Sequence, residues 1–491
     1  MKLLYPQMMV ERSESERIES TLKDSIKDGQ AWGVMNGFGT SYLAAFGVFL
    51  GASPFQLGLL GSVPQLLASM SQLLVVRLVN AIGSRKGLMV ISSAIQGSMW
   101  LAAAAMGIFG APVWLFITVA SGFFVFGLLP APAWSSLMGD LVPDDYRGKY
   151  FGRRNRSVGL VSFVTMAIGG LVLEALSPDR SGLGFALIFF VAFLGRMLSV
   201  YFLSRHYDPN LEFATPGGEG LVEFLKTSLK TDFGRLALYN SAFHIATFVV
   251  APLFVVYFLE TLQFKYWEFT AMVSAAGVAN FVTMRYWGEN ADRFGNSVVL
   301  TASSWVLVVI PLIWYGVWFV PPSWWLPIGI IVHVVSGFAW AGFNLATANY
   351  QFDSVNRESR VRLFGHYHLM HGSAMFIGGM IGGLLAQWVD FGIVELSGIF
   401  FALLLSGALR FLVCFIFLPR ISERRPVTKR PLYLYFYTMM PVEGLHADVA
   451  YGFTMTKESL RTAIREVEKR IDWRWLDKKR RTKESDAVVD A

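Results

Sequence analysis

The feature that most constrains this chain is a series of long apolar runs, each about the length of a membrane-spanning helix. A helix needs roughly 20 apolar residues to cross the hydrocarbon core, because the core is about 30 Å thick and each helical residue rises about 1.5 Å. Only 16% of the 491 residues are charged, so the expected fold class is an all-α membrane protein. We predict twelve transmembrane helices, at residues 30–50, 55–79, 87–109, 112–138, 156–176, 183–204, 235–259, 267–287, 298–318, 324–348, 364–388 and 395–418.

Basic residues gather in alternate loops between these runs. The loops of the other set contain only Arg180 and Lys265. The basic set contains Arg77, Arg85, Lys86, Arg147, Lys149, Arg153, Arg154, Arg205, Lys226, Lys230, Arg285, Arg293, Arg357, Arg360 and Arg362. The positive-inside rule therefore predicts a multi-pass protein of the cell (inner) membrane with both termini in the cytoplasm. This pattern accounts for the net charge of +7 without nucleic acid, which we do not expect as a partner.

Few residues suggest chemistry other than transport. The single cysteine, Cys414, lies in an apolar run and cannot form an intramolecular disulfide. His366, His368 and His371 lie too far around a helix to predict a metal site, since positions 366 and 368 are about 200° apart. The chain contains no P-loop pattern, so we predict no cofactor, no metal and no ATP hydrolysis.

The sequence repeats with an offset of 213 residues. Asp140 then falls on Asp353, Arg147 on Arg360, and residues 168–171 on 381–384. Many secondary transporters contain two such halves, so we predict two pseudo-symmetric six-helix bundles. The predicted divisions are a cytoplasmic N-terminal amphipathic segment 1–28, a first bundle 29–205, a central cytoplasmic linker 206–233, a second bundle 234–419 and a basic cytoplasmic tail 420–491.

Both ends of the chain contain amphipathic patterns. Ile18, Leu22 and Ile26 share one helical face, and an apolar stripe from Leu460 to Ile471 precedes a basic cluster. Such segments are typical of helices that lie on an anionic membrane surface, so membrane lipid is an expected partner. A solvated tail is the alternative for the C-terminal segment.

Two segments carry a family resemblance. Residues 288–295 fit the pattern G-x-x-x-D-R-x-G, which resembles the signature loop of the major facilitator superfamily. The equivalent residues 80–86 keep the glycine and the basic pair but have Asn80 where the family usually has aspartate. Residues 141–155 resemble the loop between helices four and five of bacterial members, which often have no assigned substrate. Over residues 20–420, the resemblance implies two bundles that rock about a central cavity lined by helices 1, 4, 7 and 10.

The signature loop suggests a gate. Asp292 would face the N-terminus of the fifth helix with its Arg153 and Arg154, and this contact would close the inner side. Gly288 and Gly295 would permit close helix approach and a tight turn. The alternative is a charged loop that only sets topology. The other gating candidates are Asn80, Gly83, Arg85, Arg147, Arg293 and Arg360.

Polar residues inside the apolar runs are candidates for the substrate cavity. His244 and Asn240 would share a cavity with Asn36 and Thr40, and His333, Trp340 and Asn344 would complete its lining. A histidine with a pKa near 6.5 could carry a proton, but a hydrogen-bonded packing role is the alternative. Coupling to protons or to sodium ions is therefore left open.

Three charged residues fall at membrane depth or at its edge. Arg196 and Arg410 occupy equivalent positions roughly 13–15 Å deep, judged from the helical rise. They either reach an anionic substrate or partner, or bond backbone carbonyls as structural clamps. We favour the clamp, because in the family helices six and twelve resemble peripheral scaffold helices. Asp28 is either a proton carrier or an interfacial carboxylate.

These observations predict a secondary active transporter that moves a small solute by alternating access and works as a monomer, not an enzyme. The alternative is a membrane receptor or scaffold that keeps the transporter fold without transport. A membrane-embedded enzyme acting on lipid would need a clustered catalytic set, which the spacings do not provide.

Overall fold

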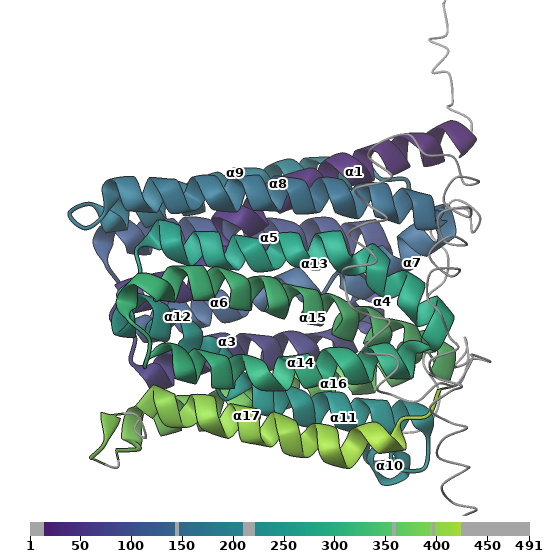
Figure 1. Ribbon diagram of the computed structural model, residues 1–491. Helices are drawn as coiled ribbons and strands as arrows, with labels where there is room; N and C mark the ends of the chain where they lie inside the picture. Colours follow the sequence, from purple (N-terminus) through teal and green to yellow (C-terminus); the bar gives the residue numbers. More distant parts are fainter. Residues whose placement is uncertain are drawn as a thin grey trace, which may run out of the picture. The chain divides into compact units, whose positions relative to one another are not determined.

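The computed structural model describes residues 14–142, 147–209, 221–355, 360–390, 392–394 and 398–423. Within this part of the chain, all regular secondary structure is helical (Figure 1). The predicted tail helix after residue 423 lies outside the described residues.

The described first half contains six helical segments along the six predicted spans, three of which are broken. Their elements are α1 (Glu14–Phe38) with η1 (Thr40–Tyr42) and α2 (Leu43–Phe49), α3 (Pro54–Ser71) with η2 (Gln72–Leu74) and α4 (Val75–Ile82), α5 (Arg85–Phe109), α6 (Val113–Leu128) with α7 (Ala131–Leu141), α8 (Arg147–Leu176) and α9 (Ser181–Ser204).

The second half follows a short helix, α10 (Leu221–Thr227), in the predicted linker. Its elements are α11 (Asp232–Phe248) with η3 (Ala251–Leu253), α12 (Phe254–Val256) and the π-helical η4 (Tyr257–Thr261), α13 (Tyr266–Phe294), α14 (Asn296–Val317), η5 (Pro322–Trp324), α15 (Trp325–Ser354), α16 (Arg360–Trp388), and α17 (Gly398–Phe417) with η7 (Leu418–Arg420).

Ten helical segments of the described chain are long and apolar enough to cross a membrane. The other two predicted spans, α1 with α2 and α13, pack along these helices but are too polar to meet the same criterion. The arrangement is that of an integral membrane protein and is consistent with twelve crossings.

Proline accounts for two of the helix breaks. Pro130 separates α6 from α7, and Pro252 lies in η3 between α11 and α12. A proline lacks the amide hydrogen and its ring clashes with the carbonyl of the preceding turn, so the helix is interrupted there. At α5 the start is fixed by Ser84, whose hydroxyl accepts a hydrogen bond from the Gly87 amide.

The helices run past the predicted spans at one end of the bundle. We call this the linker end, because α9 ends there and α11 begins there; the opposite, far end contains the turns at 50–53, 110–112 and 177–180. At the linker end α8 begins at Arg147 and α13 continues to Phe294, so segments expected to be loops are helical (Figure 1). Charged residues mark where lipid ends, not where the helix ends.

The N-terminal segment also differs from the expectation of a surface helix. Residues 14–28 are the first part of α1 and continue directly into the first crossing. Ile18 and Leu22 pack on a core cluster formed by α4, α5, α7 and α9, while Asp24 and Asp28 are buried. This stretch is therefore covered by protein on two of its faces.

Glycine permits the closest contacts between the halves. α3 packs along α16, where Gly58 lies against Gly379 and Gly383, and α8 packs along α13, where Gly170 lies against Thr270. Small residues let helix backbones approach within van der Waals contact in a membrane bundle.

Candidate functional site

The two halves are joined at the far end by polar contacts. The Tyr42 hydroxyl lies 3.1 Å from Thr270 Oγ1 and also donates to the carbonyl oxygen of Met166. The hydroxyl of Ser53 donates to Gln387 Oε1 at 3.1 Å. Together with the close approach of α8 and α13 near Gly170, these contacts close the far end of the interface between the halves.

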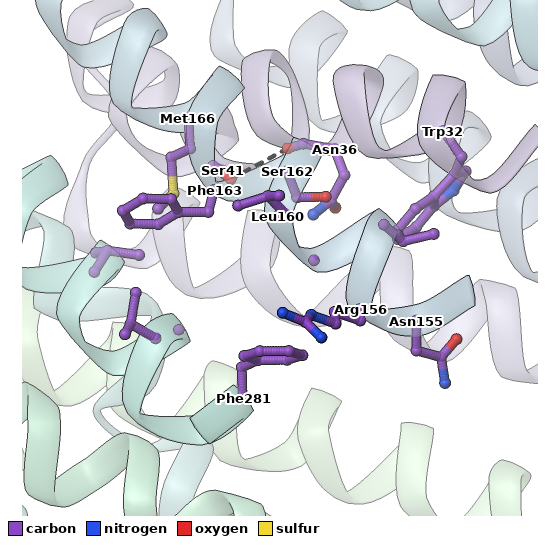
Figure 2. A pocket seen from close by; sticks show the side chains of 15 residues that line it. Trp32, Asn36, Ser41, Asn155, Arg156, Leu160, Ser162, Phe163, Met166 and Phe281 are labelled. Carbon is purple, nitrogen blue, oxygen red and sulfur yellow. Dashed lines mark hydrogen bonds between the residues drawn. The ribbon is translucent and has the colours of Figure 1, made fainter. Parts of the chain in front are cut away.

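A cavity of about 680 Å³ opens between the halves beyond this closure. It is lined by residues of α1, η1, α8 and α13, which carry indole, amide, hydroxyl, guanidinium and phenyl groups (Figure 2). The labelled lining residues are Trp32, Asn36, Ser41, Asn155, Arg156, Leu160, Ser162, Phe163, Met166 and Phe281. A volume of this size suits a small organic molecule.

The predicted cavity residues are divided among different places. Asn36 lines the cavity, and Thr40 is adjacent to the lining residue Ser41. The buried Thr40 hydroxyl has no hydrogen-bond partner among the residues that the structure describes. His244 is buried in α11, with its ring centroid 5.9 Å from Trp340. The buried side chain of Asn240 has no hydrogen-bond partner among the described residues.

The remaining two predicted cavity residues lie elsewhere. His333 contacts Phe258 and Trp314 at centroid distances of 5.5 Å, and its Nδ1 is paired with the Gly329 carbonyl. Asn344 is exposed on α15. The contacts of His333 with Phe258, Trp314 and Gly329 fit a hydrogen-bonded packing role better than a place in the cavity lining.

A histidine pair was missed by the sequence reasoning. The rings of His244 on α11 and His371 on α16 have centroids 4.1 Å apart. Tyr367 stacks on His371 at 5.8 Å. No sequence spacing links residues 244 and 371, so only the tertiary packing of α11 on α16 could show this pair.

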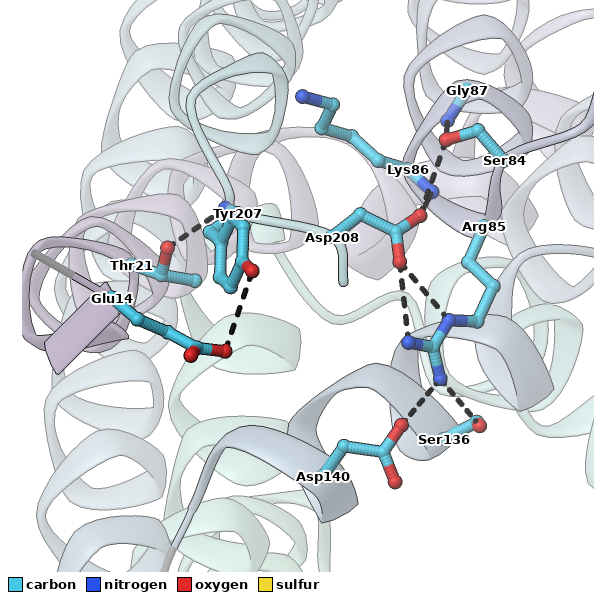
Figure 3. Close-up of polar contacts among 10 residues, drawn as sticks. All are labelled: Glu14, Thr21, Ser84, Arg85, Lys86, Gly87, Ser136, Asp140, Tyr207 and Asp208. Atoms are coloured by element: carbon cyan, nitrogen blue, oxygen red, sulfur yellow. Dashed lines mark hydrogen bonds and ion pairs between the residues drawn. The ribbon is translucent and has the colours of Figure 1, made fainter. Parts of the chain in front are cut away.

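Arg85 organises the linker end of the first half (Figure 3). Its Nη1 lies 2.6 Å from Asp140 Oδ2 and 3.0 Å from the Ser136 hydroxyl. Its Nε and Nη2 lie 3.3 and 3.2 Å from Asp208 Oδ1, while Asp208 Oδ2 accepts from the Ser84 hydroxyl and the Lys86 amide. Burial raises the pKa of Asp208, but the hydrogen bonds from Lys86 and Arg85 outweigh it and the pKa is lowered.

The second half repeats this arrangement with different residues. Glu423 accepts a hydrogen bond from the Ser297 amide at the start of α14, at 2.9 Å. Asp353, the equivalent of Asp140, accepts from Asn296 Nδ2 at 3.0 Å. Sequence reasoning missed Asp208 and Glu423, although each lies three residues after an equivalent arginine, Arg205 and Arg420.

The prediction placed Asp292 at the N-terminus of the fifth helix with Arg153 and Arg154, and among the described residues Arg154 does not contact Asp292. Arg154 Nη2 instead lies 3.5 Å from Asp28 Oδ2, its Nε donates to the Ser25 carbonyl, and its guanidinium lies 4.5 Å from the centroid of the Trp134 ring. Asp292 is exposed near the end of α13. The prediction assumed a closed linker end, whereas in this conformation Arg154 is occupied within its own half.

The signature glycines serve different purposes. Gly83 and Gly295 have φ of +74° and +96°, values that favour glycine and allow the tight turns before α5 and α14. Gly288 has open space where a side chain would be, so close helix approach, as predicted for it, is wrong here. Arg153 and Asn80 are exposed, and Arg293 lies 5.0 Å from the centroid of the Phe294 ring. The side chains of Arg147 and Arg360 lie outside the described part.

The two membrane arginines have different surroundings. Arg410 Nη1 donates to the Leu307 carbonyl at 2.7 Å, the geometry of the clamp. Arg196 donates to two hydroxyls, Ser199 at 2.9 Å and Ser93 at 2.8 Å. The Ser199 hydroxyl in turn donates to Asp28 Oδ1 at 2.6 Å, so Asp28 is a buried member of this cluster.

Comparison with known proteins places the chain in a family. The family model described as Major Facilitator Superfamily matches residues 31–340 and 236–470. This chain belongs to the major facilitator superfamily. It is therefore a secondary transporter, not an enzyme. No curated protein matches its sequence.

Solved structures show the same fold. A mutant of the nucleoside transporter NupG is similar with a TM-score of 0.63 and 14% identity, over 82% of this chain and 100% of that one. A D-xylose-proton symporter has a TM-score of 0.61 and 14% identity, over 84% and 99%. A bacterial homologue of the human lysosomal transporter Spinster, inward-facing and unoccupied, has a TM-score of 0.59 and 14% identity, over 85% and 100%.

Proposed function

We propose that this major facilitator transporter binds its solute in the cavity between α1, α8 and α13, and that the present conformation opens toward the cytoplasm. The observation that carries the proposal is the contrast between the two ends of the α8 and α13 pair. At the far end Gly170 touches Thr270, whereas toward the linker end a methyl group added to Gly159 would still lie 4.0 Å from Phe281, and one added to Gly277 would meet nothing within 4 Å.

The direction of opening rests on charge. The linker end carries the basic segments of the chain, and the positive-inside rule assigns such an end to the cytoplasm. The protein is accordingly proposed to lie in the cell (inner) membrane with both termini in the cytoplasm. The cavity would then release or collect solute on that side.

Proton coupling is proposed through His244. His371 lies 4.1 Å away between ring centroids, and two imidazoles this close disfavour double protonation, so the pair would carry one proton at a time. The two residues belong to α11 and α16, so repacking of these helices during transport would change the environment of that proton. Sodium coupling is the outcome if a proton gradient drives no flux.

Single-cysteine labelling tests the direction of opening. The only native cysteine, Cys414, is fully buried, so introduced cysteines report alone. We expect Gly277→Cys to react with a membrane-impermeant maleimide in inside-out vesicles and to stay unreactive in intact cells. Ser323→Cys, in an exposed far-end turn, is the matched control and should react only in intact cells.

The opposite labelling pattern would reject the proposed orientation, and equal labelling of Gly277→Cys from both sides would reject the closed far end. Solute flux into proteoliposomes with and without a proton gradient then tests transport and coupling. Labelling as expected but no flux over a broad solute panel would favour the receptor or scaffold.

A further inference from the structure

A second cavity, of about 440 Å³, lies within the first half of the molecule. Its lining comes from α1, α5, α6, α7, α8 and α9 and the short connection between α6 and α7. It shares Trp32, Asn155 and Val158 with the larger cavity, so the two adjoin. A solute in the first cavity could therefore extend a group into the second.

The charges that line this second cavity do not balance. They are Asp28, Arg154 and Arg196, two cations and one anion. Arg154 is paired with Asp28 at 3.5 Å, whereas Arg196 reaches Asp28 only through the Ser199 hydroxyl. One positive charge is thus left without a directly bonded carboxylate.

Arg196 is the group that carries the excess charge. It is 5% exposed, and its two terminal nitrogens are held by Ser93 and Ser199, which are neutral. Its Nε is buried and has no hydrogen-bond partner within the described part of the chain. A charged side chain at membrane depth is costly unless it is paired, so such a group marks a functional site. A guanidinium is suited to carboxylate or phosphate, because its planar fork can form two parallel hydrogen bonds.

The equivalent arginine in the second half provides the contrast. Arg410 is 3% exposed and its Nε also lacks a hydrogen-bond partner among the described residues, but it donates to a backbone carbonyl and lines neither cavity. Burial alone therefore does not explain the arrangement around Arg196. The difference between the two is the adjoining hollow space, with the indole rings of Trp32 and Trp134 in its wall.

We propose that the second cavity is a subsite for the anionic group, a carboxylate or a phosphate, of the transported solute, with Arg196 as its principal partner. This inference rests on the proposed substrate cavity and narrows its substrate class to anionic or zwitterionic molecules. Arg154 also lines this cavity, and it neutralises Asp28, with which it is paired. The larger cavity then holds the remainder of the solute.

Matched acid and amide probes test the subsite. The purified full chain is heated at constant salt with benzoate or benzamide, acetate or acetamide, and inorganic phosphate, and the shift in its melting temperature is measured. A ligand that binds only the folded state must raise apparent stability. We expect at least one acid to stabilise the protein while its amide does not.

Two variants identify the responsible charge. Arg196→Gln removes the charge and keeps hydrogen-bonding capacity toward Ser93 and Ser199, and it should weaken acid binding about tenfold or more, as expected for a lost charged hydrogen bond. Arg410→Gln, the matched control, should keep the acid response. Equal responses to acid and amide, no response to any anion, or an unchanged response in Arg196→Gln would overturn the inference.

Flux measurements separate this inference from the proposed function. Anion binding that depends on Arg196 without any flux would reject the transport site but keep the subsite. Flux of neutral solutes, undiminished in Arg196→Gln and not inhibited by benzoate, would reject the subsite but keep the transport site.

Discussion

Replacement of Asp208 with asparagine should destabilise the first half substantially. Asp208 accepts hydrogen bonds from Arg85 Nε and Nη2, from the Ser84 hydroxyl and from the Lys86 amide, and the side chains of Asp208 and Arg85 are each 3% exposed. Loss of one partner of a buried ion pair costs about 3–5 kcal/mol. Arg85 keeps Asp140 at 2.6 Å, so we expect a smaller loss, about 2–3 kcal/mol.

The control is Asp140→Asn. Asp140 also binds Arg85, but its side chain is 37% exposed, and its loss leaves Arg85 paired with Asp208. The expected cost is about 1 kcal/mol or less, because solvent screens an ion pair of this kind. The measurement is the free energy of unfolding in mixed micelles titrated with sodium dodecyl sulfate. The reasoning is refuted if Asp140→Asn costs as much as Asp208→Asn.

The pH dependence gives a second readout of the same substitution. The pKa of Asp208 is lowered from its ordinary value of 3.8 in the folded protein. Its ionised form therefore stabilises the fold above about that pH, and this contribution is lost as the pH falls below the ordinary value. Asp208→Asn should have a flatter acid limb than the parent protein. A parallel acid limb would show that Asp208 is not the titrating group.

Two further predictions concern packing and pH. Gly58→Ala should lower the free energy of unfolding by about 1–3 kcal/mol, because the added methyl group would meet the Gly379 carbonyl. The methyl group of Gly288→Ala would meet nothing within 4 Å, so this variant should stabilise α13 by up to about 1 kcal/mol. Equal free energies of unfolding for the two variants would contradict the packing described. Burial lowers the pKa of His206 from 6.5, although Asp28 and Asp24 oppose the shift. The free energy of unfolding should then fall as the pH drops below about 6.5, because the unfolded chain binds the proton more tightly. Between about pH 7 and pH 5, His206→Gln should lose less of this free energy than the parent protein does in the same titration. An identical loss would exclude His206 as the cause.

The helices were predictable because lipid imposes a simple demand on sequence. Apart from the breaks near residues 39, 129–130 and 249–250 and single residues at span ends, the described part of every predicted span is helical, because a stretch without charge must cover its backbone polar groups by intrahelical hydrogen bonding. The helix ends were not predictable in the same way. At Arg147 and Phe294 the helices extend past the apolar runs, where hydropathy no longer indicates them.

The contacts between the halves could not be read from the sequence. Tyr42 and Thr270 are 228 residues apart, and both are of types that also occur as ordinary packing residues. Asp28 was recognised as a charge in or near the membrane, but its partners on α8 and α9 depend on how three helices pack. The signature loop predicted that Asp292 lies opposite Arg153 and Arg154, because a sequence shows which charges a loop carries but not the conformation in which they meet.

The two halves have kept their framework and changed their interior. Asp208 and Glu423 each accept a hydrogen bond from a backbone amide at the start of the third helix of their half, and Asp140 and Asp353 each bind a side chain there. A capping contact needs only a carboxylate, so it can be conserved between copies. The interiors differ, since Arg196 faces a cavity and Arg410 a carbonyl oxygen. A solute without twofold symmetry can be surrounded closely by a duplicated fold only if the two copies place different side chains around it. The different surroundings of Arg196 and Arg410 are the clearest such difference in the described chain.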